Sequence, residues 1–219
     1  MRLHISRRRA QALTVIAVFL AVVIIDQAIK IWVKTHMCLH ESIHVTDWFY
    51  ILFTENNGMA FGMELFDKIF LTLGRILLTG AVAWYIARCI RDGIKWGLLV
   101  CLALIMAGAM GNIVDCLFYG LIFNSPAPPQ VASFVPFGEG YSTWFYGHVV
   151  DMLYFPLFSW DWPLWMPFCG GEHFIFFSPI FNFADACISS AVIALVLFYP
   201  KQLTLLLDKE KKEEPHAES

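Results

Sequence analysis

The chain has 219 residues, of which 58% are hydrophobic and only 15% are charged. Soluble domains are about half apolar and about a quarter charged, so this composition excludes an ordinary soluble domain and predicts an integral membrane protein. The formal net charge of −3 gives no reason to expect a nucleic-acid partner.

The first apolar segment, about residues 10–33, follows the basic residues Arg7, Arg8 and Arg9. Basic charge before an apolar run is typical of a secretory signal peptide. Here, however, the run continues into the polar stretch 26–30 without a small-residue cleavage site. We therefore expect an uncleaved transmembrane anchor.

Three further apolar segments follow, at about residues 69–90, 94–123 and 179–207. Each is long enough for a transmembrane helix, which needs about 20 residues. The four spans predict an all-α membrane protein with four transmembrane helices. The strand-like and aromatic stretches between the spans add a small extracytoplasmic β-rich segment and surface loops.

Lysines and arginines indicate the orientation of these spans. They cluster at the N-terminus, in the turn at 88–95 and after the fourth span, and short basic loops stay in the cytoplasm. Both termini are therefore expected inside, with about residues 34–68 and 124–178 outside. We expect a single membrane domain over residues 1–208, followed by a charged cytoplasmic tail at 209–219.

The outer segments differ in character. Residues 45–54 are aromatic and β-rich, which predicts a short strand or sheet. Residues 125–145 contain three prolines within four residues, at 126, 128 and 129, and two glycines, at 138 and 140, so we expect a loop there. The Trp- and Phe-rich stretch 155–168 is typical of a segment at the membrane–water boundary.

Polar residues at helical spacing occur inside the spans, where each needs a partner because hydrocarbon offers none. The pairs are Asp26 with Lys30, Asn112 with Asp115, and Asn182 with Asp185. We interpret the first as a structural ion pair, with a direct catalytic role for Asp26 as the alternative. For Asn112, contact between helices and contact with substrate both stay open, whereas Asp115 favours a structural role.

Asp151 follows the strand-like Val149 and Val150, and Asp185 lies at the start of the fourth apolar segment. An ionisable residue in a membrane segment is a functional candidate by default. If the two carboxyls meet, they share a proton and one apparent pKa rises. The ionised member can then take a proton from water while the other donates to a carbonyl under attack. This predicts peptide hydrolysis without a metal or cofactor.

Histidines offer a weaker alternative. His36, His40 and His44 would share one face of a helix and could form a metal site, but no acidic residue has metalloprotease spacing to them. We expect His148 to be a surface residue rather than a base.

Five short motifs occur in order along the chain, and together they resemble signal peptidase II, the lipoprotein signal peptidase of bacteria. The motifs are Asp26-Gln27-x-x-Lys30, Asn56-x-Gly58-x-Ala60-Phe61-Gly62, Gly108-x-x-Gly111-Asn112-x-x-Asp115, Gly147-x-Val149-Val150-Asp151 and Phe181-Asn182-x-Ala184-Asp185. The resemblance covers about residues 10–205.

The resemblance implies an aspartyl endopeptidase of the bacterial cytoplasmic (inner) membrane, with its site at the extracytoplasmic face. It implies cleavage of prolipoproteins before a diacylglyceryl-modified Cys, with membrane lipid and globomycin-type inhibitors as further partners and a monomeric state. Asp151 and Asp185 match the catalytic aspartates. The substrate-binding or supporting positions are Asn56, Gly58, Asn112, Asp115, Asn182, Asp26 and Lys30.

Three features depart from the family pattern. The family usually has Arg directly after the third-helix Asp, but this chain has Cys116. Stretches at about 124–146 and 160–171 look like insertions outside the membrane. A proton- or ion-coupled carrier is the alternative function for the same buried carboxylates, although repeated halves typical of carriers are not evident. A membrane scaffold would explain the two asparagines but not Asp151.

Overall fold

The computed structural model describes residues 2–56 and 68–202, with side chains from residue 7 onward. The helices are α1 (Arg2–His36), α2 (Lys68–Arg91), α3 (Trp96–Val114), α4 (Gly120–Ile122) and α5 (Phe183–Phe198), and a π-helical turn, Asp115–Tyr119, joins α3 to α4. The strands are β1 (Ser42–Thr46), β2 (Phe49–Asn56), β3 (Val149–Tyr154), β4 (Phe158–Asp161), β5 (His173–Phe176) and β6 (Ile180–Phe181). Gly58 and Gly62 of the second motif lie outside the described residues.

Within residues 2–56 and 68–202, three helical stretches are long and apolar enough to cross a membrane, namely Arg7–His36, Lys68–Arg91 and Trp96–Ile122. They agree with the first three predicted spans. The fourth predicted span corresponds to α5, an apolar helix of 16 residues, which is shorter than the roughly 20 residues that a full crossing needs. The structure thus gives three spans by length and leaves the fourth as a prediction.

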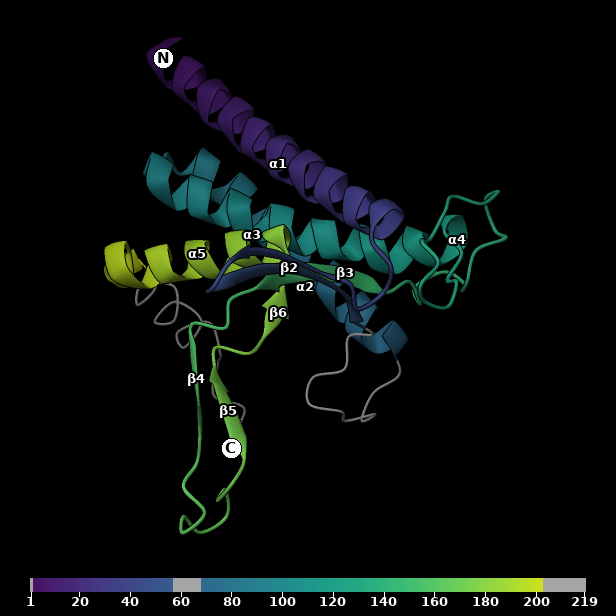
Figure 1. Cartoon of the computed structure of the whole chain (residues 1–219). Coiled ribbons are helices and arrows are strands. Elements are labelled where there is room, and N and C mark those ends of the chain that lie inside the picture. The colour runs from purple at the N-terminus through teal and green to yellow at the C-terminus, as the bar shows by residue number, and fades with distance from the viewer. Residues whose placement is uncertain (1, 57–67, 203–219) are drawn as a thin grey trace, which may run out of the picture.

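Helix α3 lies at the centre of the helical layer and packs against α1, α2 and α5 (Figure 1). Small residues make these contacts close. A Cβ atom on Gly108 would lie 2.5 Å from the carbonyl oxygen of Ala184 in α5, and one on Gly111 would lie 2.5 Å from Asp26 Oδ2 in α1. Small residues let helix backbones approach in membranes, and here they bring the polar faces of three helices together.

A four-stranded antiparallel sheet in the order β1-β2-β3-β6 packs beside the helices. The prediction of a β-rich segment is confirmed, but the sheet is larger than the one predicted at 45–54. That stretch forms parts of two strands, and β3 and β6 join them from distant sequence. Leu153 and Tyr154 pair with Phe181 and Ile180, so the sheet returns the chain to the start of α5.

The segment between α4 and β3 is irregular apart from isolated bridges, as the prolines and glycines predicted. It packs tightly on the π-helical turn. The amide of Gly147 donates to the carbonyl oxygen of Cys116 at 2.9 Å, and a Cβ on Gly147 would lie 2.1 Å from the carbonyl oxygen of Asp115. This insertion therefore supports the helix that carries Asp115.

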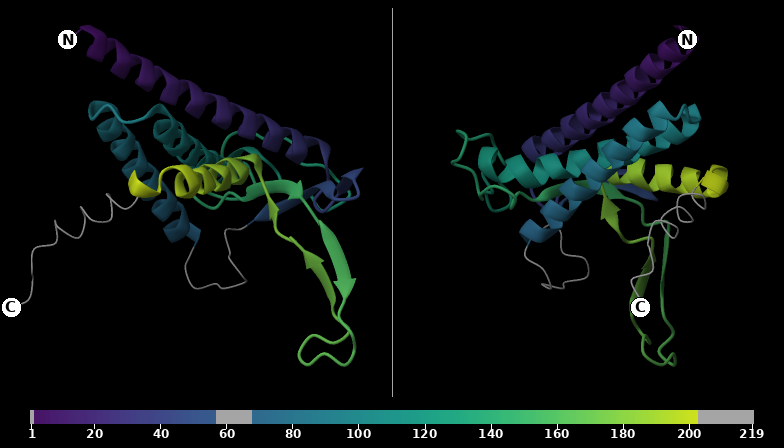
Figure 2. Two further views of the ribbon diagram at one scale, coloured as in Figure 1. Left: turned by 90° about the vertical axis from the view of Figure 1, so that its left-hand side faces the viewer. Right: turned by 180° about the vertical axis from the view of Figure 1, so that it is seen from behind.

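The strands β4 and β5 form a separate hairpin, which projects away from the body of the molecule (Figures 1 and 2). We call residues 157–177 the aromatic arm. Its apolar side chains are exposed, most strongly Leu164, Trp165 and Phe168 at its tip. The predicted boundary segment is thus largely a hairpin, because the aromatic residues pair across two short strands.

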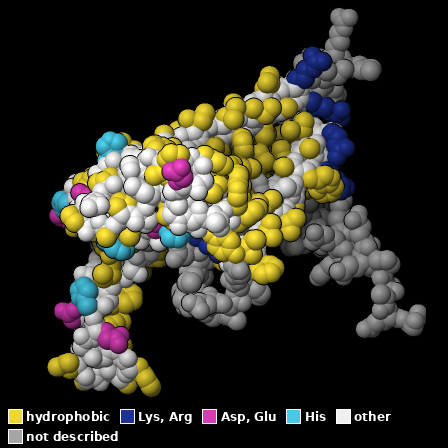
Figure 3. All heavy atoms as spheres, turned by 90° about the vertical axis from the view of Figure 1, so that its right-hand side faces the viewer, with side chains coloured by type: hydrophobic (Ala, Val, Ile, Leu, Met, Phe, Trp, Pro, Cys, Tyr) yellow, Lys and Arg dark blue, Asp and Glu magenta, His cyan; other side chains and the backbone are white. Residues whose placement is uncertain are grey.

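Charge is segregated along the molecule. Lysines and arginines gather at the end where α1 begins, acidic residues and histidines gather at the other end, and apolar side chains cover much of the surface between them (Figure 3). The basic end unites two parts of the chain, because Arg8 donates to the carbonyl oxygen of Arg91 at 2.7 Å.

We predict that Gly108→Ala lowers the free energy of unfolding by about 1–3 kcal/mol, because the new methyl group overpacks the contact between α3 and α5. Thermal unfolding of the detergent-solubilised protein would measure this. Gly80→Ala in α2 is the matched control, since nothing lies within 4 Å of its added Cβ and alanine favours a helix. Equal melting temperatures for the two variants would contradict the close contact at Gly108.

Candidate active site

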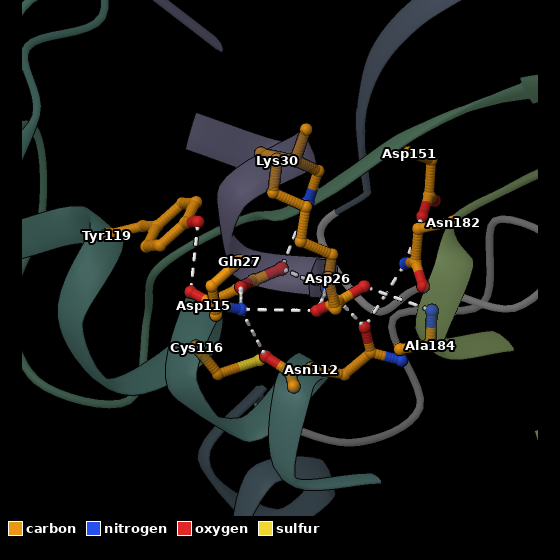
Figure 4. Close-up of polar contacts among 12 residues, drawn as sticks. Asp26, Gln27, Lys30, Asn112, Asp115, Cys116, Tyr119, Asp151, Asn182 and Ala184 are labelled. Carbon is orange, nitrogen blue, oxygen red and sulfur yellow. Dashed lines mark hydrogen bonds and ion pairs between the residues drawn. The ribbon is translucent and has the colours of Figure 1, made fainter. Parts of the chain in front are cut away.

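A buried lysine joins two buried carboxylates at the centre of the helical layer (Figure 4). Lys30 Nζ lies 2.9 Å from Asp26 Oδ2 and 2.8 Å from Asp115 Oδ2, and all three side chains have no exposed surface. The predicted pair of Asp26 and Lys30 is present, and Asp115 extends it from α1 to α3. Buried charges are tolerated when they are paired and hydrogen-bonded in this way.

Further hydrogen bonds complete this ion cluster. Gln27 Nε2 donates to Asp115 Oδ1 at 2.8 Å, and the Tyr119 hydroxyl donates to Gln27 Oε1 at 3.1 Å. The amide of Ala184 donates to Asp26 Oδ1 at 3.0 Å. Asp26 therefore fixes the first turn of α5 against α1. The roles of Gln27, which belongs to the first motif, and of Tyr119 were not predicted.

Asp115 is the first residue of the π-helical turn. Such turns are rare and occur often at functional sites. One extra residue in the turn changes the direction of the side chains that follow, and here Cys116 and Tyr119 are both buried. Asp115 Oδ2 also lies 3.4 Å from the amide nitrogen of Val150, which donates to it, so the ion cluster reaches β3.

Asn182 and Asp185 form a capping box at the start of α5. The amide of Asp185 donates to Asn182 Oδ1 at 3.0 Å, and the amide of Asn182 donates to Asp185 Oδ2 at 3.3 Å. These bonds satisfy backbone donors that a helix N-terminus would otherwise leave without partners. Asn182 is buried while Asp185 is half-buried, so the cap holds a partly accessible carboxylate in a fixed position.

The side-chain amide of Asn182 also reaches Asp151. Asn182 Nδ2 donates to Asp151 Oδ1 at 2.7 Å, and Asn56 gives the same carboxyl another hydrogen bond. Asp151 is only 3% exposed. Burial first, and then the negative charge of Asp185, raise the pKa of Asp151 to about 7. Asp151 therefore keeps its proton far above the usual range of a carboxyl group.

Asn112 links the ion cluster to these two acids. Its Oδ1 accepts from Lys30 Nζ at 2.8 Å, and its Nδ2 donates to Asp185 Oδ1 at 2.8 Å. Asn182 Nδ2 also donates to Asn112 Oδ1 at 3.1 Å. The predicted exchange of hydrogen bonds between amides and carboxylates on facing helices is thus present. Its result is that Asn182 and Asn112, bonded to each other, link Asp151 to Asp185.

A second charged cluster lies beside this site and was not predicted as a cluster. Lys34 and Glu55 form an ion pair, and His148 Nδ1 lies 2.7 Å from Glu55 Oε2. Burial of Glu55 favours its neutral form, but the hydrogen bond from His148 and the Lys34 ammonium outweigh it, so the pKa of Glu55 lies below its ordinary value. His148, which was expected to be a surface residue rather than a base, is partly exposed and is held by Glu55 and the ring of Tyr141.

The histidines considered as metal ligands do not share a helix. His36 ends α1, His40 lies in a turn with a φ of 69°, and His44 lies in β1. Among residues 2–56 and 68–202, no three His, Cys, Asp or Glu side chains gather into a metal site. Gly58, a predicted supporting residue, lies in the segment that the structure does not describe.

The chemistry that this arrangement permits is acid–base catalysis by two carboxyls in unequal environments. Asp151 is buried with a raised pKa, whereas Asp185 is half-buried at a helix N-terminus, where a negative charge is favourable. Acids placed in this way can divide the donor and acceptor roles in one reaction.

Comparisons with known proteins identify the family of this chain. The model of a protein family described as "Signal peptidase (SPase) II" matches residues 18–200. A lipoprotein signal peptidase of Porphyromonas gingivalis is 50% identical over 205 residues, which are 93% of this chain and 90% of that protein. Another, from Amoebophilus asiaticus, is 38% identical over 81% of this chain and 74% of its own length.

Solved structures give a similar result for the fold. A structure described as a bacterial membrane enzyme superposes with a TM-score of 0.56 at 24% sequence identity, and covers 94% of both chains. A second structure with that description also has a TM-score of 0.56, over 84% of this chain and 90% of the other. These similarities support the arrangement of helices and sheet described above.

We predict that Lys30→Met lowers the free energy of unfolding by about 3–5 kcal/mol, because it leaves two buried carboxylates without their cation. Chemical or thermal unfolding in detergent would show the loss. Lys95→Met is the matched control, since Lys95 is exposed at the turn before α3. If both variants unfold at the same temperature as the parent protein, Lys30 is not the centre of the ion cluster.

Proposed function

Because the chain belongs to the signal peptidase II family, we propose that it is an aspartic endopeptidase that removes signal peptides from prolipoproteins. Cleavage occurs on the N-terminal side of a Cys that carries diacylglycerol. The observation that carries this proposal is the linked pair of carboxyls: Asn182 binds Asp151, Asn112 binds Asp185, and the two asparagines bind each other.

In the proposed reaction, one carboxylate takes a proton from water and the other carboxyl donates a proton to the scissile carbonyl. The raised pKa of Asp151, about 7, favours one proton on the pair at neutral pH. The titration belongs to the pair rather than to either residue alone. No metal or cofactor takes part in this scheme.

We propose that the other predicted residues position Asp151 and Asp185, directly or through one another. Asn112 and Asn182 position the two acids by direct hydrogen bonds, and Asn56 bonds to Asp151. Asp26, Lys30 and Asp115 form the ion cluster beneath them. We propose that the asparagines also contact the peptide, since they border the carboxyls, while the ion cluster fixes the helices.

We further propose that residues 1–208 form one domain of the bacterial inner membrane, with α5 as the fourth span and both termini in the cytoplasm. The gathering of lysines and arginines at one end of the molecule supports this orientation (Figure 3). The site lies toward the opposite, extracytoplasmic end. We propose that the enzyme is a monomer and that its lipid-bearing substrate enters this site from the bilayer. A globomycin-type inhibitor would bind at the same position.

We predict that Asp151→Asn and Asp185→Asn each reduce cleavage of a diacylglyceryl-modified prolipoprotein by at least about 10²-fold, since each removes one acid–base partner. Cleavage can be followed by gel shift or mass spectrometry. Asp161→Asn is the matched control, because Asp161 lies on the aromatic arm and pairs with His173. Parental activity in either of the first two variants, with the fold intact, would refute the assignment.

We also predict the direction of the pH dependence. Because the pKa of Asp151 is raised to about 7, the pair holds its shared proton below that pH and loses it above. The value of kcat/KM should therefore fall as pH rises beyond about 7, approaching a tenfold loss per pH unit. Steady-state cleavage rates between pH 5 and 9 test this, and a value that keeps rising to pH 9 would exclude the shared proton.

A further inference from the structure

Helix α2 carries a polar stripe on one face. Lys68, Thr72, Arg75 and Thr79 are four, three and four residues apart, so they share a face of the helix. Thr72 and Thr79 are buried and Arg75 is half-buried. Arg75 is seven residues beyond Lys68, or about 10 Å along the helix. A guanidinium at this depth of an apolar helix is costly and calls for a partner.

The structure gives this guanidinium one weak acceptor. Arg75 Nη1 lies 3.5 Å from Cys116 Sγ, and a thiol accepts hydrogen bonds poorly. Among the residues that the structure describes, no carboxylate forms an ion pair with Arg75. An arginine offers five N–H donors, and among the described residues the contact to Cys116 occupies one of them.

The position of Arg75 is fixed relative to the candidate site. Two neighbours on its stripe bind the loop that leads to β3: Lys68 Nζ donates to the carbonyl oxygen of Tyr146 at 3.0 Å and Thr72 Oγ1 donates to that of Phe145 at 3.3 Å. Cys116 directly follows Asp115 of the ion cluster. The guanidinium therefore lies on the α2 side of the π-helical turn that begins at Asp115, a member of the ion cluster.

We propose that Arg75 is a substrate-binding residue that donates hydrogen bonds to carbonyl oxygens of the diacylglyceryl-cysteine. This inference rests on the proposed function and adds a recognition contact to it. The permanently charged, planar guanidinium suits oxygen acceptors, and its aliphatic stem can lie along an acyl chain. The family usually has Arg where this chain has Cys116, and Arg75 brings a guanidinium to that sulfur from another helix.

Binding of a synthetic diacylglyceryl-cysteine peptide to the full-length protein in detergent tests this inference without requiring cleavage. We expect Arg75→Gln to weaken binding at least about tenfold, the loss expected for a hydrogen bond from a charged donor. Arg88→Gln is the matched control, because Arg88 is exposed on the same helix and contacts Trp84. Its affinity should equal that of the parent protein.

A relocated arginine provides the sharpest measurement. In the double variant Arg75→Gln/Cys116→Arg, the new guanidinium extends from the sulfur position that Arg75 now contacts, and affinity should return to within about threefold of the parent value. An ether-linked analogue of the peptide distinguishes the acceptor. If Arg75→Gln loses affinity only for the ester-linked peptide, the ester carbonyls accept the hydrogen bonds of Arg75. If it loses affinity equally for both peptides, the acceptor is a carbonyl of the peptide backbone.

Two results would overturn the inference: parental affinity in Arg75→Gln, or a folded double variant that binds no better than Arg75→Gln. If Arg75→Gln does not fold, the test uses only the double variant Arg75→Gln/Cys116→Arg. Weak peptide binding by the folded double variant refutes the contact, and near-parental binding supports it. A parent protein that binds the peptide but does not cleave it contradicts the proposed function while leaving Arg75 in its role. A parent protein that does not bind the peptide overturns both.

Discussion

One buried ammonium group constrains the whole membrane part of this protein. Lys30 contacts two carboxylates and an asparagine that come from two different helices. Any shift of α1 against α3 would leave at least one of these charges in an apolar interior without a partner, and the energetic penalty for that is severe. The glycines of α3 allow the close approach that this geometry requires. Packing and electrostatics therefore specify the same arrangement.

The four acids near the centre of the molecule have two kinds of partner, a charged lysine or neutral amides. Asp26 and Asp115 face a lysine and are sealed from solvent, whereas Asp151 and Asp185 are held by neutral amides. A neutral partner orients a carboxyl group without fixing its charge, so the second pair can still exchange protons. In the proposed function, the ion cluster supplies rigidity and the amide-held pair supplies reactivity, so that one site would contain both structural and functional acids.

Local patterns in the sequence predicted much of this. Helical spacing placed Asn112 with Asp115 and Asn182 with Asp185, and their burial in apolar segments indicated that they must satisfy one another. The choice of partners could not be predicted, because it depends on contacts between residues 70 or more positions apart. Strand β6 has two residues and no periodicity to detect. For the cluster around Glu55 the sequence contained one pattern that could have predicted it: Lys34 lies one helical turn beyond Lys30 and so belongs to the same helix face.

Asn182 has a consequence for the order in which the molecule is made. The same side chain caps α5 and binds Asp151, so the start of the last described helix is tied to strand β3, whose Asp151 lies 31 residues earlier in the chain. Asp185 lies three residues beyond Asn182. The arrangement of the two acids can therefore form only after the first turn of α5 has been synthesised.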